Sequence, residues 1–428
     1  MEEHAVDENK FQERPLDPNG KGLGPSPANS RIGDVPMLGW ELLADDVSLP
    51  VAVLRQDRIE HNLAWMSRFI QAYGVQLAPH GKTTMSPALF HRQLEHGAWG
   101  ITLATAPQVQ AARNHGVRRV LMANQLVGKA NMAIISRLLQ DPDFDFFCLV
   151  ESPTNVEALG RHFSEAGQRL RVLLEFGTQG GRTGVRDAAQ EAEVLAAIAR
   201  WPQAISLVGC EVYEGVLQEE HQVRQLLGHV LERTRRLASE GRFGEPEVIL
   251  SGAGSAWFDV VAETFSGQDI GRPLQVVLRP GCYLTHDAGI YREAARRIHA
   301  SNAVAQEMGS SLLPALQLWA HVQALPEPGL AIVGLGKRDA AFDAGMPLPA
   351  LHHRPGEGNQ PTAAPAAWTL TRMMDQHAFM ETPPDADLRV GDMLAFDISH
   401  PCLTFDKWRQ LLLVDDGYRV RGAVETFF

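Results

Sequence analysis

The chain has 428 residues, of which 45% are hydrophobic and 21% are charged, an ordinary composition for a globular protein of about two domains. Its 39 basic and 51 acidic residues give a formal net charge of −12, which argues against nucleic acid or an anionic membrane surface as a partner. No apolar run approaches the roughly 20 residues of a membrane helix, and the acidic start Met1–His4 is unlike a signal or transit peptide, so we expect a soluble, cytoplasmic protein.

The first 34 residues are polar and rich in Pro, Gly, Asn and Asp. Such a composition predicts a flexible arm over residues 1–34 that could wrap over the surface or over a partner subunit. The segment 36–54 follows, and its apolar run Val51–Leu54 predicts a strand that leads into the next domain.

From about residue 75 to 280, short β-rich runs alternate with segments of helical spacing. The eight predicted strands are Val75–Ala78, Ile101–Ala104, Arg119–Met122, Phe146–Val150, Val172–Phe176, Ser206–Val212, Val248–Leu250 and Val276–Leu278. The helical segments include Pro107–His115, Lys129–Leu139, Asp187–Arg200 and Glu219–Glu240. Near-continuous apolar strands that alternate with helices predict an α/β fold, a (β/α)8 TIM barrel. We place this domain, with its lead-in strand, at residues 35–299, and a doubly wound open sheet is the alternative.

After about residue 300, Pro and Gly punctuate short alternating runs. Strands are predicted at Leu316–Gln323, Ala331–Gly334, Trp368–Arg372, Asp392–Ile398 and Leu411–Val414, with a loop-rich stretch at 344–367. This pattern predicts a β-rich C-terminal domain over residues 300–428.

The four cysteines (Cys148, Cys210, Cys282 and Cys402) are far apart in the sequence and form no Cys-x-x-Cys pair. We therefore expect free thiols in a reducing compartment, with at least one available for a special role.

One lysine, Lys82, follows the first predicted barrel strand within the run Pro79-His80-Gly81-Lys82-Thr83. Barrel enzymes work at the C-terminal ends of their strands, and a lysine kept partly deprotonated there can form a Schiff base. A phosphate-binding P-loop is excluded, because the required glycine five positions before Gly81 is replaced by Gln76.

A glycine-containing turn follows the seventh predicted strand and consists of Ser251, Gly252, Ala253, Gly254 and Ser255. Its backbone N–H groups could approach a phosphate at the start of the next helix, although a plain turn is the alternative. A lysine and a phosphate cradle in one barrel suggest pyridoxal phosphate. Arg182 could then bind the phenolic oxygen of the cofactor and Tyr213 could border its ring.

The run from Asp397 to Cys402 carries a His-x-Cys pair on a segment that we expect to be extended. Both His400 and Cys402 would then lie on one side, close enough to share a divalent metal. Imidazole and thiolate favour zinc over manganese or magnesium, and two ligands leave positions open for water or substrate. The alternative is a buried cysteine beside a satisfied histidine.

These motifs occur in one order: Pro79–Thr83, the Gly-Gly-Arg-Thr-Gly-Val run at 180–185, Tyr213, the 251–255 turn, Arg279-Pro280-Gly281 and His400-Pro401-Cys402. Over residues 45–428 the set resembles the D-serine dehydratase/D-threonine aldolase group of alanine-racemase-fold (fold-type III) pyridoxal-phosphate enzymes. The resemblance implies that Lys82 is the Schiff-base lysine and that His80, Arg182 and Tyr213 adjoin the cofactor. It also implies phosphate binding by 252–255, metal binding by His400 and Cys402, and a homodimer.

The function that we expect is dehydration and deamination of a β-hydroxy-D-amino acid, namely D-serine, D-threonine or D-3-hydroxyaspartate, to a 2-oxo acid and ammonia. Lys82 would remove the α-proton, and the metal would act as a Lewis acid on the β-hydroxyl.

Three alternatives remain open. A D-threonine aldolase would cleave the Cα–Cβ bond, but such aldolases tend to carry a carboxylate where Cys402 stands. A racemase needs a second acid/base; the run Val333–Asp339 offers no tyrosine for it, although Tyr283 or Tyr291 could substitute. A non-catalytic pyridoxal-phosphate carrier would be a single barrel without the second domain.

Overall fold

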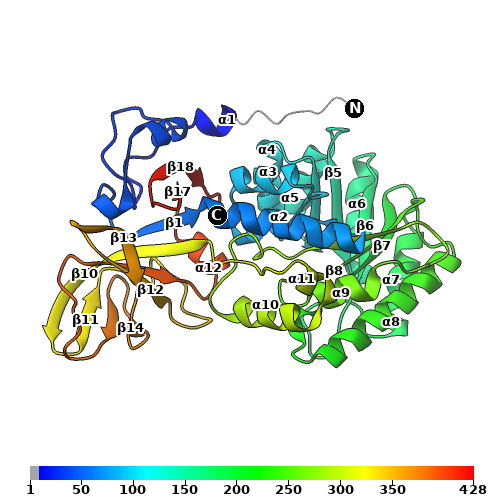
Figure 1. The fold of residues 1–428 in the computed structure, drawn as a ribbon. Coiled ribbons are helices and arrows are strands. Elements are labelled where there is room, and N and C mark those ends of the chain that lie inside the picture. The colour runs from blue at the N-terminus through cyan, green and yellow to red at the C-terminus, as the bar shows by residue number, and fades with distance from the viewer. Residues whose placement is uncertain (1–8) are drawn as a thin grey trace.

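The protein consists of a barrel of parallel strands beside a domain of mostly antiparallel strands (Figure 1), as seen in a computed structural model that describes residues 9–428. No helix within residues 9–428 is both long and apolar enough to span a membrane.

The barrel contains eight parallel strands in the spatial order β2-β9-β8-β7-β6-β5-β4-β3. They are β2 (Gln76–Leu77), β3 (Ile101–Leu103), β4 (Arg119–Gln125), β5 (Asp145–Val150), β6 (Leu170–Phe176), β7 (Ile205–Val212), β8 (Val248–Gly252) and β9 (Leu274–Leu278). A parallel bridge between His80 and Thr102 joins the two ends of the sheet and closes it. The predicted (β/α)8 barrel is thus confirmed, and all eight residues of β7 are buried, as expected of a strand covered on both faces.

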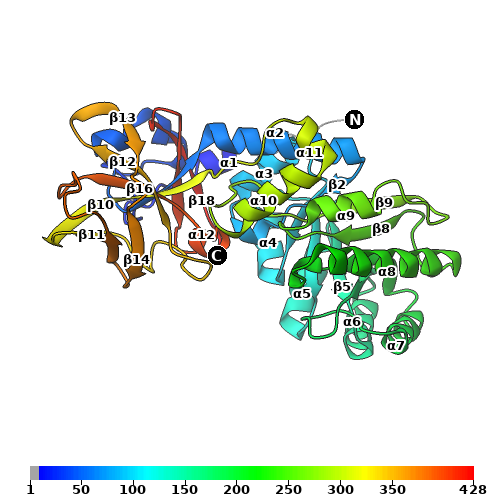
Figure 2. The same ribbon diagram turned by 60° about the horizontal axis from the view of Figure 1, so that its bottom comes forward.

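Helices follow the strands and cover the outside of the barrel, as Figure 2 shows for α6, α7 and α8. They are α2 (Gln56–Tyr73), α3 (Pro87–Glu95), α4 (Ala106–Asn114), α5 (Lys129–Leu138), α6 (Pro153–Glu165), α7 (Ala188–Ala199), α8 (Glu220–Ser239), α9 (Phe258–Phe265), α10 (Ile290–Ser301) and α11 (Ala303–Glu307). Side chains of Thr105, Ser152 and Asp187 accept backbone N–H bonds at the starts of α4, α6 and α7, which defines where these helices begin.

The second domain is a ten-stranded sheet. It contains β1 (Val51–Arg55), β10 (Leu316–Glu327), β11 (Leu330–Val333), β12 (Leu348–Arg354), β13 (Glu357–Ala363), β14 (Thr369–Met373), β15 (Ala378–Glu381), β16 (Met393–Asp397), β17 (Gln410–Val414) and β18 (Val420–Glu425). The expectation that 344–367 is loop-rich is wrong, because β12 and β13 form a hairpin there. Most β13 residues are exposed, so its sequence has no apolar alternation to reveal it.

The predicted lead-in strand, β1, does not belong to the barrel, contrary to our expectation. Strand β1 pairs with β10 (antiparallel) and with β17 (parallel) in the second domain. All five of its residues are buried. Val51 and Val53 pack with Trp319 on one face, whereas Ala52 and Leu54 join the main core on the other, so the strand is a central member of this sheet.

Residues 9–34, expected to form a loosely ordered arm, pack against the second domain (Figure 1, blue). Leu16 and Ile32 lie in a buried cluster with residues of η1 (Ile32–Met37) and η2 (Leu42–Ala44). The amine of Lys21 lies 3.8 Å from the centre of the Trp408 ring and 2.7 Å from Asp339 Oδ1. Residues 1–8 of the predicted arm lie outside the described residues.

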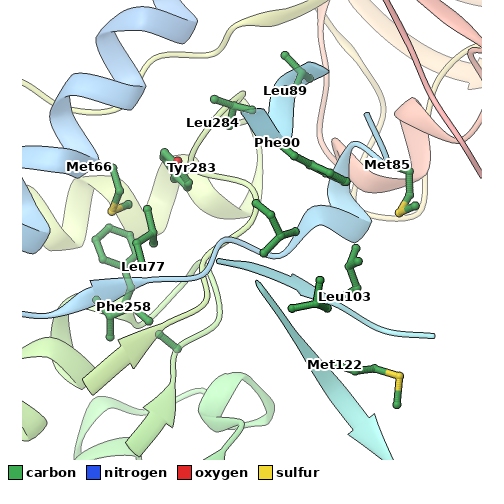
Figure 3. Packing of buried hydrophobic residues seen from close by; sticks show 14 of the residues in the cluster. Met66, Leu77, Met85, Leu89, Phe90, Leu103, Met122, Phe258, Tyr283 and Leu284 are labelled. Carbon is green, nitrogen blue, oxygen red and sulfur yellow. The ribbon is translucent and has the colours of Figure 1, made fainter. Parts of the chain in front are cut away.

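Part of the main apolar core packs around the first barrel strand, β2, as Figure 3 shows for Met66, Leu77 and Tyr283. A Cβ atom on Gly81 would lie 2.7 Å from Phe90 Cε1 and 2.9 Å from Ile101 Cγ2. One on Gly281 would lie 2.5 Å from the His80 carbonyl oxygen. Glycine at both positions therefore allows the chain around residue 82 to pack directly on this core.

Candidate active site

Lys82 lies in a short 3-10 turn, η3 (Gly81–Thr83), that follows β2 at the C-terminal end of the barrel. Although the residue is reached by solvent, burial of its amine lowers the pKa from the usual 10.5, and the positive charges of Arg182 and Arg279 act in the same direction. The thiol groups of Cys402 and Cys282 oppose this shift. The amine is therefore easier to deprotonate than an ordinary lysine.

His80 lies beside Lys82 with a neutral ring. Burial, followed by the charges of Lys82 and Arg279, lowers its pKa well below 6.5. Its Nδ1 atom is buried and has no hydrogen-bond partner within residues 9–428. A buried polar atom without a partner is costly, which favours a bound group that the chain itself does not provide.

Arg182 and Tyr213, which the sequence places on separate loops, meet at the mouth of the barrel. Arg182 follows β6 and Tyr213 follows β7, and the guanidinium carbon lies 4.1 Å from the centre of the tyrosine ring. A Cβ atom on Gly254 would lie 3.1 Å from Tyr213 Cε2, so the glycine lets the predicted phosphate turn approach this ring closely. The two candidate cofactor residues thus stack on each other beside the turn.

The turn after β8 binds a carboxylate of the protein itself. Ala253 has a left-handed backbone (φ +79°). The N–H groups of Ala253 and Gly254 donate to the Glu214 carboxylate at 3.1 and 2.7 Å. Glu214, in η4 (Glu214–Val216), is fully buried, and we did not predict it as a site residue.

The first and last residues of the predicted turn make bonds within the chain. Ser251 lies in β8, is fully buried, and its hydroxyl donates to the Val277 carbonyl oxygen. Ser255 Oγ accepts the N–H of Cys282 at 3.1 Å. Ser251 is therefore part of the barrel framework, whereas Gly252 ends β8 and only residues 253–255 form the open turn.

A buried ion pair ties the ends of β7 and β8 to the residue that follows β9. Arg279 and Glu211 are 3% and 1% exposed and form a hydrogen-bonded pair. Arg279 Nε also donates to Ser251 Oγ at 3.0 Å. Arg279 was named within a sequence motif, but its pairing with Glu211 was not predicted, although both residues stand at strand ends, where site residues are expected.

His400 and Cys402 are brought to the same place, but not by an extended segment. Strand β16 ends at Asp397, Pro401 has helical angles (φ −57°, ψ −47°), and Cys402 begins the short helix α12 (Cys402–Phe405). The expectation that the segment with His400 and Cys402 is extended is wrong, because the chain turns into a helix at Pro401. His400 Nδ1 lies 2.8 Å from Asp343 Oδ2, and contacts with Cys402 and Asp343 raise the pKa of His400 to about 9.

Two cysteines and a threonine form a small cluster where α12 meets the Lys82 turn. Cys282 Sγ lies 3.7 Å from Cys402 Sγ, and Thr83 Oγ1 lies 3.5 Å from Cys402 Sγ. Hydrogen bonds with Cys282, His400 and Thr83 lower the pKa of the Cys402 thiol, whereas its burial acts in the opposite direction. Across the described part of the chain, no group of three or more His, Cys, Asp and Glu side chains is arranged to hold a metal ion.

Tyr283 and Tyr291 are the two tyrosines considered as alternative acid/base groups, and Tyr283 lies away from the barrel mouth. Tyr283 is 2% exposed, packs within the core (Figure 3) and accepts a hydrogen bond from Gln93. Tyr291 instead lies beside the cysteine cluster, where interaction with Cys282 and burial raise its pKa.

Known families match both parts of the chain. The family model described as alanine racemase, N-terminal domain, matches residues 54–273, slightly more than half of the chain, and a serine dehydratase domain model matches residues 315–414. A 3-hydroxy-D-aspartate aldolase of Paracoccus denitrificans (strain Pd 1222) is 25% identical over 314 residues, covering 71% of this chain and 76% of that protein.

Two further proteins are also similar to this chain. A D-threo-3-hydroxyaspartate dehydratase of Delftia sp. (strain HT23) is 32% identical over 152 residues, which cover 35% of this chain and 39% of that protein. The crystal structure of D-threonine aldolase from Filomicrobium marinum matches with a TM-score of 0.74 at 21% identity, covering 91% of this chain and 97% of that one. At this identity the match establishes a shared fold.

Proposed function

Because the chain belongs to the alanine racemase N-terminal domain family, we propose that it is a pyridoxal-phosphate-dependent lyase that dehydrates and deaminates β-hydroxy-D-amino acids. D-Serine, D-threonine and D-3-hydroxyaspartate are the candidate substrates. The proposal is supported chiefly by two groups from different domains that lie together. Lys82 lies in the turn after the first barrel strand, and Cys402 of the His400/Cys402 pair from the second domain contacts this turn at Thr83.

The residues at the barrel mouth fit pyridoxal phosphate. Lys82 offers an amine of lowered pKa, and His80 Nδ1 lacks a partner. The N–H groups of Ala253 and Gly254 already bind a carboxylate, which stands in for an anionic group at this turn. When bound, the cofactor supplies a sink for the electron pair left at Cα.

The chain's own groups then have defined tasks. Lys82 Nζ takes the α-proton, for which its lowered pKa suits it at neutral pH. Arg182, stacked on Tyr213, presents a positive charge at the barrel mouth, where it can orient an anionic group. The neutral ring of His80 lies against Lys82 without adding charge there.

A divalent metal also fits, as an open site with two protein ligands. Asp343 holds Nδ1 of His400, which leaves Nε2 for a metal, and Cys402, whose thiol pKa is lowered, would bind the ion as a thiolate. Nitrogen and sulfur donors favour zinc over manganese or magnesium. Such an ion would supply Lewis-acid polarisation of the substrate β-oxygen.

Aldol cleavage is the second candidate, because the aldolase of Paracoccus denitrificans matches over 71% of this chain. Elimination needs a base at the α-proton, where Lys82 is proposed to act, whereas aldol cleavage needs a base at the β-hydroxyl. The thiolate of Cys402, in a position where the aldolases of this group tend to carry a carboxylate, favours elimination. We also propose that the protein is cytoplasmic and forms a homodimer. Light scattering of the purified protein tests whether it is a dimer.

Product analysis separates the two reactions. Protein loaded with pyridoxal phosphate is incubated with D-threonine and D-3-hydroxyaspartate, with and without a chelator. We expect 2-oxobutyrate or oxaloacetate with equimolar ammonia, formed more slowly after chelation. Glycine with acetaldehyde or glyoxylate would establish aldol cleavage, and no 2-oxo acid from these substrates or from D-serine would refute the dehydratase proposal. Cys402→Ala should behave like chelated protein, and Cys210→Ala, in the barrel interior, is its control.

A further inference from the structure

We propose that Cys282 and Cys402 form a reversible disulfide, so that this pair is an oxidation site that switches the active site off. The effect on activity rests on the proposed function, but formation of the disulfide does not. The two residues are 120 positions apart in the sequence and belong to different domains. Nothing in the proposed reaction requires Cys282.

The sulfur atoms of Cys282 and Cys402 are neighbours in the structure. The sulfur atoms are 3.7 Å apart, in direct contact, and must close to about 2.05 Å for a disulfide. Cys402 is the first residue of the four-residue helix α12, and Cys282 lies in the loop after β9. Each sulfur also contacts Thr83 Oγ1, at 3.5 Å from Cys402 and 3.8 Å from Cys282, so the pair faces the Lys82 turn.

The two sulfur atoms differ in their exposure to solvent, as a two-step oxidation requires. Cys402 is partly exposed, whereas Cys282 is only 3% exposed. An oxidant dissolved in water therefore meets Cys402 first, and Cys282 is placed behind it as the resolving thiol. The hydroxyl of Thr83 beside Cys402 provides a hydrogen-bond partner to its sulfur.

Hydrogen peroxide serves as the oxidant. The Cys402 sulfur attacks one peroxide oxygen, the O–O bond breaks, and the second oxygen leaves as water after protonation. The sulfur of Cys282 then attacks the sulfenic acid of Cys402, forms the S–S bond and displaces a second water. In total, two thiols lose two electrons and two protons, and one peroxide yields two waters. A dithiol such as dithiothreitol reverses the change by exchange.

The disulfide would remove the Cys402 thiolate from the proposed metal pair and tie α12 to the barrel loop. Metal binding and disulfide formation therefore exclude each other, so bound zinc should slow oxidation.

The other two cysteines provide internal controls. Cys148 and Cys210 are fully buried in barrel strands, and burial raises the pKa of each thiol to about 12. A dissolved oxidant therefore reaches neither of these two sulfur atoms.

The test treats the purified full-length protein with hydrogen peroxide, with and without zinc. We expect the thiol count under denaturing conditions to fall from four to two. Peptide mapping should give one cross-linked pair, Cys282 with Cys402. Zinc affinity and lyase activity should be lost together and return with dithiothreitol.

The variant Cys282→Ser should keep its zinc affinity and form no disulfide, and peroxide should then damage it irreversibly at Cys402. A disulfide that involves Cys148 or Cys210, or oxidation of Cys402 to a sulfinic or sulfonic acid while Cys282 stays a thiol, would overturn the proposal. So would a Cys282–Cys402 disulfide that leaves zinc affinity unchanged. If the disulfide forms and abolishes zinc binding but the reduced protein has no lyase activity, the oxidation site stands and the proposed reaction fails.

Discussion

Glu214 and Gly254 are joined across the mouth of the barrel, where the Gly254 N–H donates to Glu214 Oε1 at 2.7 Å. The carboxylate thereby occupies the turn on which a cofactor phosphate is proposed to bind. Two anions cannot share the same N–H donors without strong repulsion. Glu214 must therefore leave this position, or be protonated, when a phosphate binds.

The variant Glu214→Gln should bind pyridoxal phosphate more tightly. It keeps the size of the side chain and removes the charge, which we expect to favour the complex by about 1 kcal/mol, or roughly fivefold in Kd. Absorbance titration of the cofactor-free protein measures this. Glu219→Gln, an exposed neighbour, is the matched control and should leave Kd unchanged. Weaker binding by Glu214→Gln alone would mean that the carboxylate organises the turn for phosphate.

The stability of the protein should depend on pH through Glu175. Burial raises the pKa of this carboxyl from 4.5, although Thr183 and Gln125 donate hydrogen bonds to it. The folded state then holds a proton that the unfolded state has released, so this contribution to stability is complete below pH 4.5 and is lost as pH rises through the folded pKa.

The variant Glu175→Gln removes this dependence. Relative to the parent protein, its free energy of unfolding should increase with pH, by ~1.4 kcal/mol for each unit of the pKa shift. Urea unfolding at pH 5 and pH 8 measures the difference. An unchanged difference between the two pH values would show that Glu175 has the same pKa in both states.

The variant Asp343→Asn should weaken zinc binding without unfolding the protein. Asp343 accepts a hydrogen bond at His400 Nδ1 and is itself exposed, so its loss alters the orientation and basicity of the proposed ligand. Removing such a carboxylate typically costs 10–100-fold in metal affinity. Competition with a chromophoric chelator gives the affinity, and Asp375→Asn, at another exposed ion pair, is the control. Equal affinities would remove His400 from the metal site.

Adding a methyl group at Gly81 should destabilise the protein, whereas adding one at Gly228 should not. The Gly81 Cβ would lie 2.7 Å from Phe90 Cε1 in a filled core, and such overpacking typically costs ~1–3 kcal/mol. Gly228 lies in α8 with nothing within 4 Å of its Cβ position, so Gly228→Ala should stabilise by about 0.5–1 kcal/mol. Denaturant unfolding compares the two, and equal stabilities would contradict the packing described around Lys82.

Sequence reasoning finds those site residues whose role depends on their position after a strand. Lys82, Arg182, Tyr213 and the 253–255 turn could be found because each lies in the segment that follows an apolar run, and the barrel brings these segments together.

The residues that were missed depend on contacts between distant loops. Glu214 was overlooked because its importance comes from the turn after β8, 40 positions away, and not from its own neighbours. Cys282 was predicted only as a free thiol, because its contact with Cys402 requires the second domain to dock on the barrel. The sheet to which β1 belongs could not be read either, because its fully apolar run fits a buried strand in both domains.

Chemical trapping shows whether Lys82 carries the cofactor. Protein loaded with pyridoxal phosphate is reduced with borohydride, digested, and searched for the pyridoxyl group by mass spectrometry. We expect the label on the peptide that contains Lys82, no label in Lys82→Ala, and full labelling in Lys337→Ala. A label on a different lysine, or an unlabelled protein that still produces 2-oxo acid, would contradict the account.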